Sequence, residues 1–343
     1  MPRRDVVVVG ASAGGVEALR DLVRELPADL EATVLVVLHM PPAAFSALPA
    51  ILDRSGKLPA RTPAEGEVLE PGVVFVAPPD RHLLLRHDHV VLGYGPKENG
   101  HRPAIDPLFR SAARWRGPRA VGVILSGTLD DGAAGLATLV ECGGAALVQD
   151  PESALYDSMP CAAIRAVPGV RTATVPALAT LISDLCREDV AVDASPAERL
   201  LEMETEIPEM GEDALSDEQR PGRPAAMTCP DCNGAMFELT EGLVLRFRCR
   251  VGHAWSPDSL LMERVEEMEG ALWAAIRSLE EKAALHRQLA DRAAGSRALS
   301  AGRGYHQGRA KEADSSAALL RDLLRRPLIA DDAPYPHEVE SER

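Results

Sequence analysis

The chain opens with an apolar run that changes abruptly into glycines and then into a helical pattern. Val6–Val9 is an uninterrupted β-branched run, typical of a parallel strand that is covered on both faces. Beyond the glycines, apolar residues recur at the spacing of an amphipathic helix, namely at Val16, Leu19, Leu22, Val23 and Leu26. The pattern therefore predicts a sharp strand-to-helix turn over Gly10–Gly15, with Ser12 at its corner.

Apolar runs and helical patterns continue to alternate up to about Leu185. This alternation predicts an α/β fold with a mostly parallel, doubly wound (Rossmann-like) sheet. The strand candidates are Val6–Val9, Thr33–Leu38, Val73–Ala77, Ala120–Leu125 and Ala145–Val148. Leu83–Arg86 and Val90–Leu92 predict an inserted β-hairpin. In such sheets the carboxyl ends of the strands share one edge, where ligands bind.

Three interpretations of the turn at Ser12 compete. A dinucleotide fingerprint fails twice, because Ser12 replaces its second glycine and the next valine-rich run ends in His39 rather than in an acid. A nucleophile elbow, G-x-S-x-G, would hold the Ser12 hydroxyl above the sheet at a helix N-terminus. A plain helix cap explains the same serine. Turn chemistry alone leaves the last two interpretations open.

A histidine and two aspartates follow other predicted strands. His39 ends the second strand, and the fourth runs into a glycine-rich turn that carries Asp130 and Asp131. Serine, histidine and aspartate at strand ends supply the nucleophile, the general base and the orienting carboxylate of a serine hydrolase. Their order along the chain differs from the Ser, Asp, His order of α/β-hydrolases, which indicates a different fold with the same chemistry.

Composition narrows the possible functions. Hydrophobic residues make up 46% of the chain, which suffices for a core. Aromatic residues make up only 3% and the formal net charge is −15, so nucleic acid is not an expected partner. Cys142, Cys161 and Cys186 lie in or beside apolar segments and are expected to be small buried residues. Neither a signal peptide nor a membrane-spanning segment is predicted, so we expect a cytoplasmic protein without membrane insertion.

Several blocks together resemble a known family. Gly10–Gly15, Val37–Pro41 and Gly100–Ala113 are similar to the catalytic domain of CheB, the protein-glutamate methylesterase of bacterial chemotaxis. The blocks Ala77–His82, Leu125–Leu136 and Gln149–Pro160 agree with it. The resemblance extends over roughly residues 5 to 185, and several ordered blocks are more specific than any single motif.

The resemblance implies roles for individual residues. It makes Ser12 the nucleophile, His39 the base and Asp131 the orienting aspartate, with no cofactor for catalysis. Backbone N–H groups of Ala13 and Thr128 would form the oxyanion hole. Relatives often carry threonine at the position of Ala13 and Met-Gly at Thr128-Leu129, and these departures bear on substrate preference more than on chemistry. The best-known family member also carries an N-terminal phospho-receiver domain, whereas this chain begins at the catalytic strand, so we expect no built-in receiver.

Three polar residues in the block Gly100–Ala113 have two equally good interpretations. His101, Arg102 and Asp106 either line the catalytic cleft or stabilise the structure around it.

The C-terminal half carries a strong metal-binding signature. Cys229-x-x-Cys232 is followed by Cys249-x-x-x-His253, a spacing that predicts a structural zinc site in a zinc-ribbon-like module. A redox Cys-x-x-Cys would leave Cys249 and His253 without a role. In so small a module, metal binding would supply folding energy that a small core cannot.

The remaining segments are organised around this module. We expect a catalytic domain over residues 1–186, an acidic linker over 187–227, the zinc module over 228–257, a helical hairpin over 258–330 and a disordered tail over 331–343. The hairpin carries a heptad-like apolar stripe, which indicates either internal packing or a docking face for a dimer or receptor.

The resemblance implies an enzyme that hydrolyses glutamate methyl esters on the cytoplasmic helices of chemoreceptors, releases methanol and also deamidates glutamines. Other chemosensory proteins would then be partners of the C-terminal region. Two alternatives remain open: a zinc-ribbon scaffold with an idle α/β domain, and an esterase or amidase with a non-receptor substrate.

Overall fold

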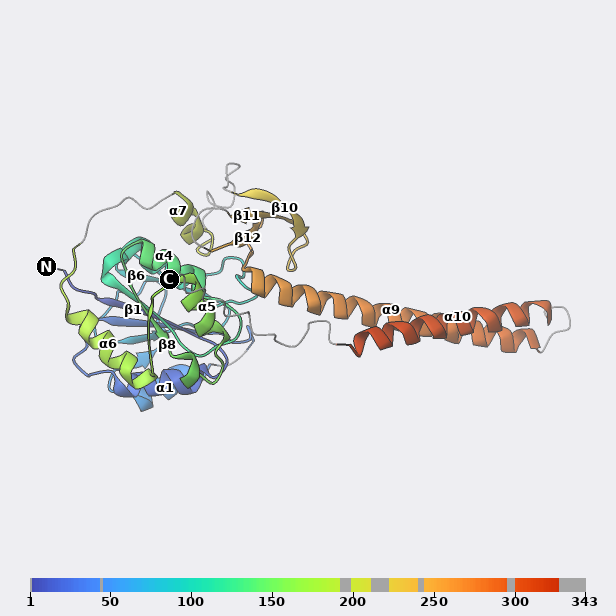
Figure 1. Ribbon diagram of the computed structural model, residues 1–343, viewed down its shortest axis with the longest axis horizontal. Helices are drawn as coiled ribbons and strands as arrows, with labels where there is room; N and C mark the ends of the chain where they lie inside the picture. The colour runs from blue at the N-terminus through green and yellow to red at the C-terminus, as the bar shows by residue number, and fades with distance from the viewer. Residues whose placement is uncertain are drawn as a thin grey trace, which may run out of the picture. The chain divides into compact units, whose positions relative to one another are not determined.

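The computed structural model describes residues 2–43, 46–191, 199–210, 222–239, 244–294 and 300–326. Its residues divide into two compact units, Met1–Leu260 and Leu261–Arg343. Figure 1 shows the chain coloured from its N-terminus to its C-terminus. The first unit contains the α/β sheet together with the segment of the cysteine and histidine motif.

Among the described residues, seven parallel strands form the main sheet of the first unit, in the order β3-β4-β2-β1-β7-β8-β9. The strands are β1 (Val6–Ala11), β2 (Thr33–Leu38), β3 (Ala60–Arg61), β4 (Val74–Val76), β7 (Ala120–Ile124), β8 (Ala145–Gln149) and β9 (Arg171–Ala173). The predicted α/β class is confirmed. The sequence pattern did not predict the edge strands β3 and β9, because two or three residues are too few to show a period.

The order of the strands reverses between β1 and β7. The chain runs from β1 through β2 to β4 on one side of β1, and then returns through β7 to the other side. Such a reversal is where open α/β sheets bind their ligands, outside the carboxyl ends of the two flanking strands. The ends of β1 and β7 are therefore the expected site, and they carry Ser12 and the acidic turn.

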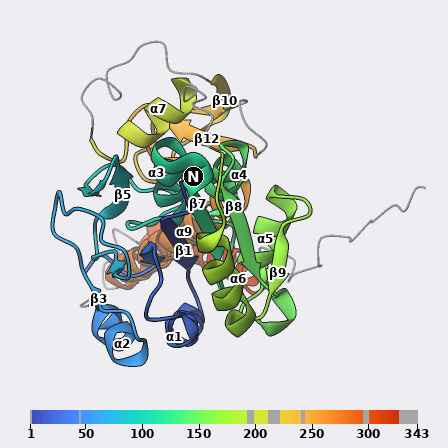
Figure 2. The ribbon, with the colours of Figure 1, turned by 90° about the vertical axis from the view of Figure 1, so that its left-hand side faces the viewer.

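Helices cover both faces of the sheet, as Figure 2 shows. One face is covered by α1 (Gly15–Glu25), α2 (Leu48–Ser55) and α6 (Val175–Arg187). The other is covered by α3 (Ile105–Arg116), α4 (Ala133–Glu141), α5 (Ser158–Ala166) and the predicted hairpin, β5 (His82–Arg86) and β6 (His89–Gly93). Because side chains alternate along a strand, Val7 and Val9 face the first layer and Val6 and Val8 the second.

Part of the predicted acidic linker is a packed helix of the first unit, although its charge and prolines favoured an unpacked segment. Residues Arg199–Glu206 form α7, and Leu200, Met203 and Ile207 make a buried cluster. Glu204 is also buried, because Arg246 and Arg248 pair with its carboxylate. The net charge of a segment therefore does not exclude packing when buried acids find cationic partners.

Four antiparallel strands form the small sheet that carries the cysteine and histidine motif, in the order β10-β11-β12-β13. They are β10 (Arg223–Thr228), β11 (Ala235–Leu239), β12 (Arg246–Cys249) and β13 (Ala254–Trp255). The core of this sheet is small and consists of Cys229, Met236, Phe247, Cys249, Trp255 and Leu260. We call the segment 223–259, which contains these four strands and the four residues after β13, the ribbon.

Two long helices, α9 (Pro257–Ala294) and α10 (Ser300–Leu324), account for the described part of the second unit. They pack through small side chains that are buried between them, among them Ala283, Ala290, Ala310, Ala313 and Ala317. Ion pairs flank this seam, from Arg287 to Asp314 (2.7 Å) and from Arg321 to Glu280. The predicted tail, residues 331–343, lies outside the described residues.

Gly10 of β1 is expected to tolerate no side chain. A Cβ atom there would lie 2.3 Å from Cγ2 of Ile105, so Gly10→Ala should lower the free energy of unfolding by about 1–3 kcal/mol. Urea unfolding measures this loss. Because the clash is with one side chain, the double variant Gly10→Ala/Ile105→Ala should lose less stability than the two single variants together. Strict additivity of the two losses would contradict the expectation.

Candidate active site

Ser12 lies at the corner between β1 and α1, held by backbone contacts. Its N–H donates to Ser126 O (3.0 Å), and its carbonyl accepts from the N–H of Gly15 (2.9 Å). Gly14 has a φ of 70°, a left-handed conformation that suits glycine. Helix α1 begins after Gly14 and has no side-chain cap, so the helix-cap interpretation of Ser12 is wrong. Its hydroxyl is free for another role.

The Ser12 hydroxyl lies beside His39, which follows β2. The Oγ of Ser12 is 3.1 Å from His39 Nδ1, and His39 Nε2 is 2.7 Å from Oδ2 of Asp131. A carboxylate at Nε2 fixes the proton of the neutral ring on that nitrogen, which leaves Nδ1 as an acceptor for the serine proton. The three predicted residues thus form one hydrogen-bonded series beside the reversal of the sheet.

The Asp131 carboxylate is buried and receives hydrogen bonds from several elements. Its Oδ2 also accepts from the N–H of Ile105 (2.7 Å), and its Oδ1 accepts from the N–H of Asp106 (3.2 Å) and from Nδ2 of Asn99 (2.9 Å). Burial by itself would raise the pKa of Asp131. The hydrogen bond and charge of His39 and the Ile105 N–H outweigh it and lower the pKa below its usual value, so the carboxylate stays ionised.

Asp130, the alternative acid, faces away from His39. Its Oδ1 accepts from the hydroxyls of Ser256 (2.5 Å) and Ser259 (3.1 Å). Burial raises the pKa of Asp130 to about 6, against these two hydrogen bonds. The geometry therefore assigns the contact with the imidazole to Asp131.

His101, Arg102 and Asp106 of the block Gly100–Ala113 lie in different surroundings. His101 stacks on His39, with ring centroids 3.8 Å apart and an angle of 16° between the planes. Burial and the neighbouring His39 lower the pKa of His101 to about 4, so its ring is neutral at pH 7. Arg102 lies outside this contact and pairs with Asp80 (2.6 Å).

Asp106 lies beneath the site rather than in it. It accepts a hydrogen bond from the N–H of Gly135 (2.6 Å) and is buried next to Asp131. Burial and the Asp131 charge raise the pKa of Asp106 to about 7. Its role is to support the start of α4, and it makes no contact with the serine–histidine pair among the bonds of the described residues.

Two backbone amides, those of Ala13 and Thr128, are the predicted donors to an incoming oxyanion. The Gly127 N–H donates to Tyr156 O (3.0 Å), and the Ser12 N–H is likewise used. In the described part of the chain no backbone acceptor occupies the N–H groups of Ala13 and Thr128. These are the two donors that the sequence predicted, and their role remains a prediction.

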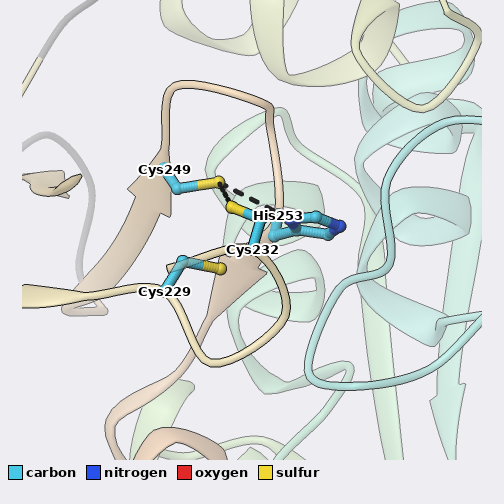
Figure 3. Close-up of side chains that lie close together, drawn as sticks. All are labelled: Cys229, Cys232, Cys249 and His253. Atoms are coloured by element: carbon cyan, nitrogen blue, oxygen red, sulfur yellow. Dashed lines mark hydrogen bonds between the residues drawn. The ribbon is translucent and has the colours of Figure 1, made fainter. Parts of the chain in front are cut away.

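A second cluster lies in the ribbon, where four potential ligand atoms meet (Figure 3). One atom from each of Cys229, Cys232, Cys249 and His253 lies within 4.8 Å of all the others. Cys249 Sγ is 3.7 Å from Cys232 Sγ and 3.6 Å from His253 Nδ1. Ligands about 2.3 Å from a tetrahedral ion lie about 3.8 Å apart. The donor set and its spacing could therefore hold a tetrahedrally coordinated metal ion.

Asn99 is a residue of the site that the sequence patterns did not predict. Asn99 and Gly100 both have positive φ, 51° and 77°, and the flanking Glu98 and His101 exchange two backbone hydrogen bonds. This is a two-residue hairpin turn with φ > 0 at both positions. The Asn-Gly dipeptide was visible in the sequence as a turn signal, but its contact with Asp131 was not.

Among the described residues, none of the helices has the length and apolar content needed to cross a membrane.

A strand-end serine, histidine and aspartate at the reversal of a parallel sheet is the arrangement of a serine hydrolase site on a doubly wound α/β domain. Residues 7–182 match the CheB methylesterase family, and the chain belongs to that family.

Three relatives show how far the similarity extends. A protein-glutamate methylesterase/protein-glutamine glutaminase of Anaeromyxobacter dehalogenans is 43% identical over 186 residues, 53% of this chain and 51% of that protein. A protein of the same name from Methanosarcina mazei is 39% identical over 170 residues, 47% and 46% of the two chains. The crystal structure of the Thermotoga maritima CheB methylesterase catalytic domain has a TM-score of 0.51 and 30% identity, and the match covers 53% of this chain and 98% of that one. The chain thus spans about half the length of the curated relatives.

The stacked His101 is expected to make stability depend on pH. Between pH 6.5 and about 4 the unfolded chain binds a proton at this residue that the folded chain excludes, so the stabilisation present above pH 6.5 is lost as the pH falls. His101→Phe keeps an aromatic ring without the proton. The free energy of unfolding of this variant, relative to the wild type, should therefore rise by up to about 1.4 kcal/mol per pH unit as the pH falls through this window.

Urea unfolding at a series of pH values checks this expectation, with His101→Asn as the control that removes the ring as well. Both variants should show the same trend with pH. A difference from the wild type that stays constant between pH 6.5 and 4 would contradict it.

Proposed function

We propose that this protein is a serine hydrolase that demethylates glutamate methyl esters, a protein-glutamate methylesterase. The observation that carries the proposal is the hydrogen-bonded series Ser12–His39–Asp131 at the reversal of the sheet. The relatives, which are protein-glutamate methylesterases/protein-glutamine glutaminases, supply the substrate class.

The geometry supports a two-step acyl transfer. Ser12 Oγ attacks the ester carbonyl while Nδ1 of His39 accepts its proton, and Asp131 stabilises the imidazolium that forms. The N–H groups of Ala13 and Thr128 would receive the oxyanion. Methanol leaves with the proton from His39, and the acyl group remains on Ser12. Water, deprotonated by His39, then releases glutamate.

The same intermediate serves a second reaction of the relatives. A glutamine side chain attacked by Ser12 would release ammonia instead of methanol and leave the same acyl-enzyme. We infer that the substrates are methylated glutamates and glutamines on the cytoplasmic helices of chemoreceptors, in a chemosensory pathway of the cytoplasm. Other chemosensory proteins would be partners of the C-terminal region.

We further propose that Cys229, Cys232, Cys249 and His253 hold a structural zinc ion. Zinc would cross-link β10 to the loop after β12 and stabilise a sheet whose own core is small. All four protein ligands lie within reach, which suits a closed structural site rather than a catalytic one. Catalysis itself would use no cofactor.

Ser12→Ala is expected to abolish the release of methanol from a methylated chemoreceptor fragment, with a loss of at least about 10³-fold in kcat. Ser55→Ala, which changes a serine at the end of α2 that bonds to Ile51 O, is the matched control and should retain activity. A fluorophosphonate probe, which reacts with activated serines, should label Ser12 alone. Release of methanol by Ser12→Ala at the wild-type rate would refute the assignment.

The zinc proposal predicts about one zinc ion per chain in the purified protein, measured by elemental analysis. Cys229→Ser should lose the metal, because a serine hydroxyl is a poor substitute for a thiolate ligand. Cys161→Ser, which changes a free cysteine of α5, is the control and should keep it. Equal zinc contents of the two variants would contradict the ligand assignment.

A further inference from the structure

We propose that the ribbon positions the catalytic carboxylate, with Asn99 as the positioning residue that links Ser256 of the ribbon to Asp131. The inference rests on the proposed esterase function and adds a role for the zinc module within it. Metal bound in the ribbon would raise kcat at the Ser12 site without contacting that site.

The first step is the contact between Asn99 and Asp131. Asn99 supplies the side-chain donor to Oδ1 of Asp131 (2.9 Å), and the N–H of Asp106 supplies a longer backbone bond to the same atom (3.2 Å). The other oxygen, Oδ2, is shared by His39 and the Ile105 N–H. A rotation of the carboxylate would therefore move the oxygen that faces His39, and Asn99 opposes that rotation.

The second step is the contact between Asn99 and the ribbon. The Ser256 N–H donates to Oδ1 of Asn99 (2.7 Å), and the backbone N–H of Asn99 donates to Ala254 O (2.8 Å). A donor at one end of the amide requires the carbonyl oxygen there, so the NH₂ group must face Asp131. Ser256 thus favours the same orientation of the amide as the ionised Asp131 carboxylate, which can only accept hydrogen bonds.

The ribbon also holds the neighbouring acid. Ser256 Oγ and Ser259 Oγ both donate to Asp130, the residue before Asp131. The residues after β13 thus hold Asp130 directly and Asp131 through Asn99. Ser256 lies three positions after His253, so the metal-binding loop and the contact with the acidic turn belong to one short stretch of chain.

A buried ion cluster fixes the other side of the ribbon against the α/β domain. Glu98, the residue before Asn99, pairs with Arg110 of α3 (2.7 Å) and with Arg248 of β12 (3.0 Å). Arg248 also donates to Gly252 O (2.6 Å), within the loop between Cys249 and His253. Disorder of that loop would therefore weaken the contacts of the ribbon with Asn99 and leave Glu98 with Arg110 as its remaining partner.

The test compares Asn99→Gly with the wild type in the full chain. Glycine keeps the positive φ of position 99 but removes the donor, so kcat for methanol release should fall about 10- to 100-fold while KM stays within about twofold. Asp131 would then lack one donor to its charged form, so the acid limb of the pH profile of kcat should move to higher pH. A residue that only stabilised the fold would leave that limb in place.

The link to the metal is tested by a double-mutant cycle. Cys229→Ser, without zinc, should lower kcat as Asn99→Gly does, and the double variant should be no slower than the slower single variant. Removal of zinc from the wild type with a chelator should slow the labelling of Ser12 by fluorophosphonate, and addition of zinc should restore it. Cys161→Ser is the control for both measurements.

Wild-type kcat and an unmoved acid limb in Asn99→Gly would overturn the proposal, and so would multiplication of the two losses in the double variant. If the wild type released no methanol, the proposed function would fail, while the rate of Ser12 labelling would still report whether Asn99 and the zinc site position the series. The two failures are thereby distinguished.

Discussion

The burial of one ionised carboxylate, that of Asp131, constrains the construction of the first unit. A charge removed from water is costly unless its lone pairs are used, and here donors arrive from separate parts of the chain. His39 comes from the end of β2, Ile105 and Asp106 from the start of α3, and Asn99 from the turn before it. The contacts that hold these segments around Asp131 therefore also hold Ser12, His39 and Asp131 in their hydrogen-bonded arrangement.

The same principle explains how an acidic chain buries a second polar cluster. Glu98 and Glu204 share the guanidinium groups of Arg110, Arg246 and Arg248, all buried. Such pairs add little net stability, but each requires its partner, since removal of one leaves an uncompensated buried charge. These buried ion pairs therefore favour a single packing arrangement of α7 and the ribbon on α3. Apolar contacts alone would allow several arrangements.

The features that could be predicted from the sequence are those whose signal is local. The valine runs predicted the central strands, the glycines around Ser12 predicted the turn, and the cysteine spacing predicted the cluster in the ribbon. The choice between Asp130 and Asp131 needed the family resemblance, because both acids stand in the same turn.

The contacts of Asn99 and the packing of α7 could not be predicted. They depend on residues distant in the sequence: Glu204 of α7 pairs with arginines 42 and 44 positions away, and the partner of Asn99 in the ribbon is 157 positions distant. No periodicity or spacing in the sequence reports a pairing of that kind. The acidic segment was predicted to be a linker because its sequence does not show that Arg246 and Arg248 neutralise the buried Glu204.

The position of Ser256 in the chain has a consequence for biosynthesis. It bonds to Asp130, 126 residues earlier, so the acidic turn is synthesised long before the segment that covers it. At roughly 5–20 residues per second, a ribosome needs about 6–25 s to bridge that interval. During this time the nascent α/β domain can form its sheet around β1 and β7 while Asp130 still lacks the hydroxyls that will hold it. The contacts of the acidic turn are thus completed only after Ser256 and Ser259 have been made, long after the nucleophile Ser12 and Asp130 itself.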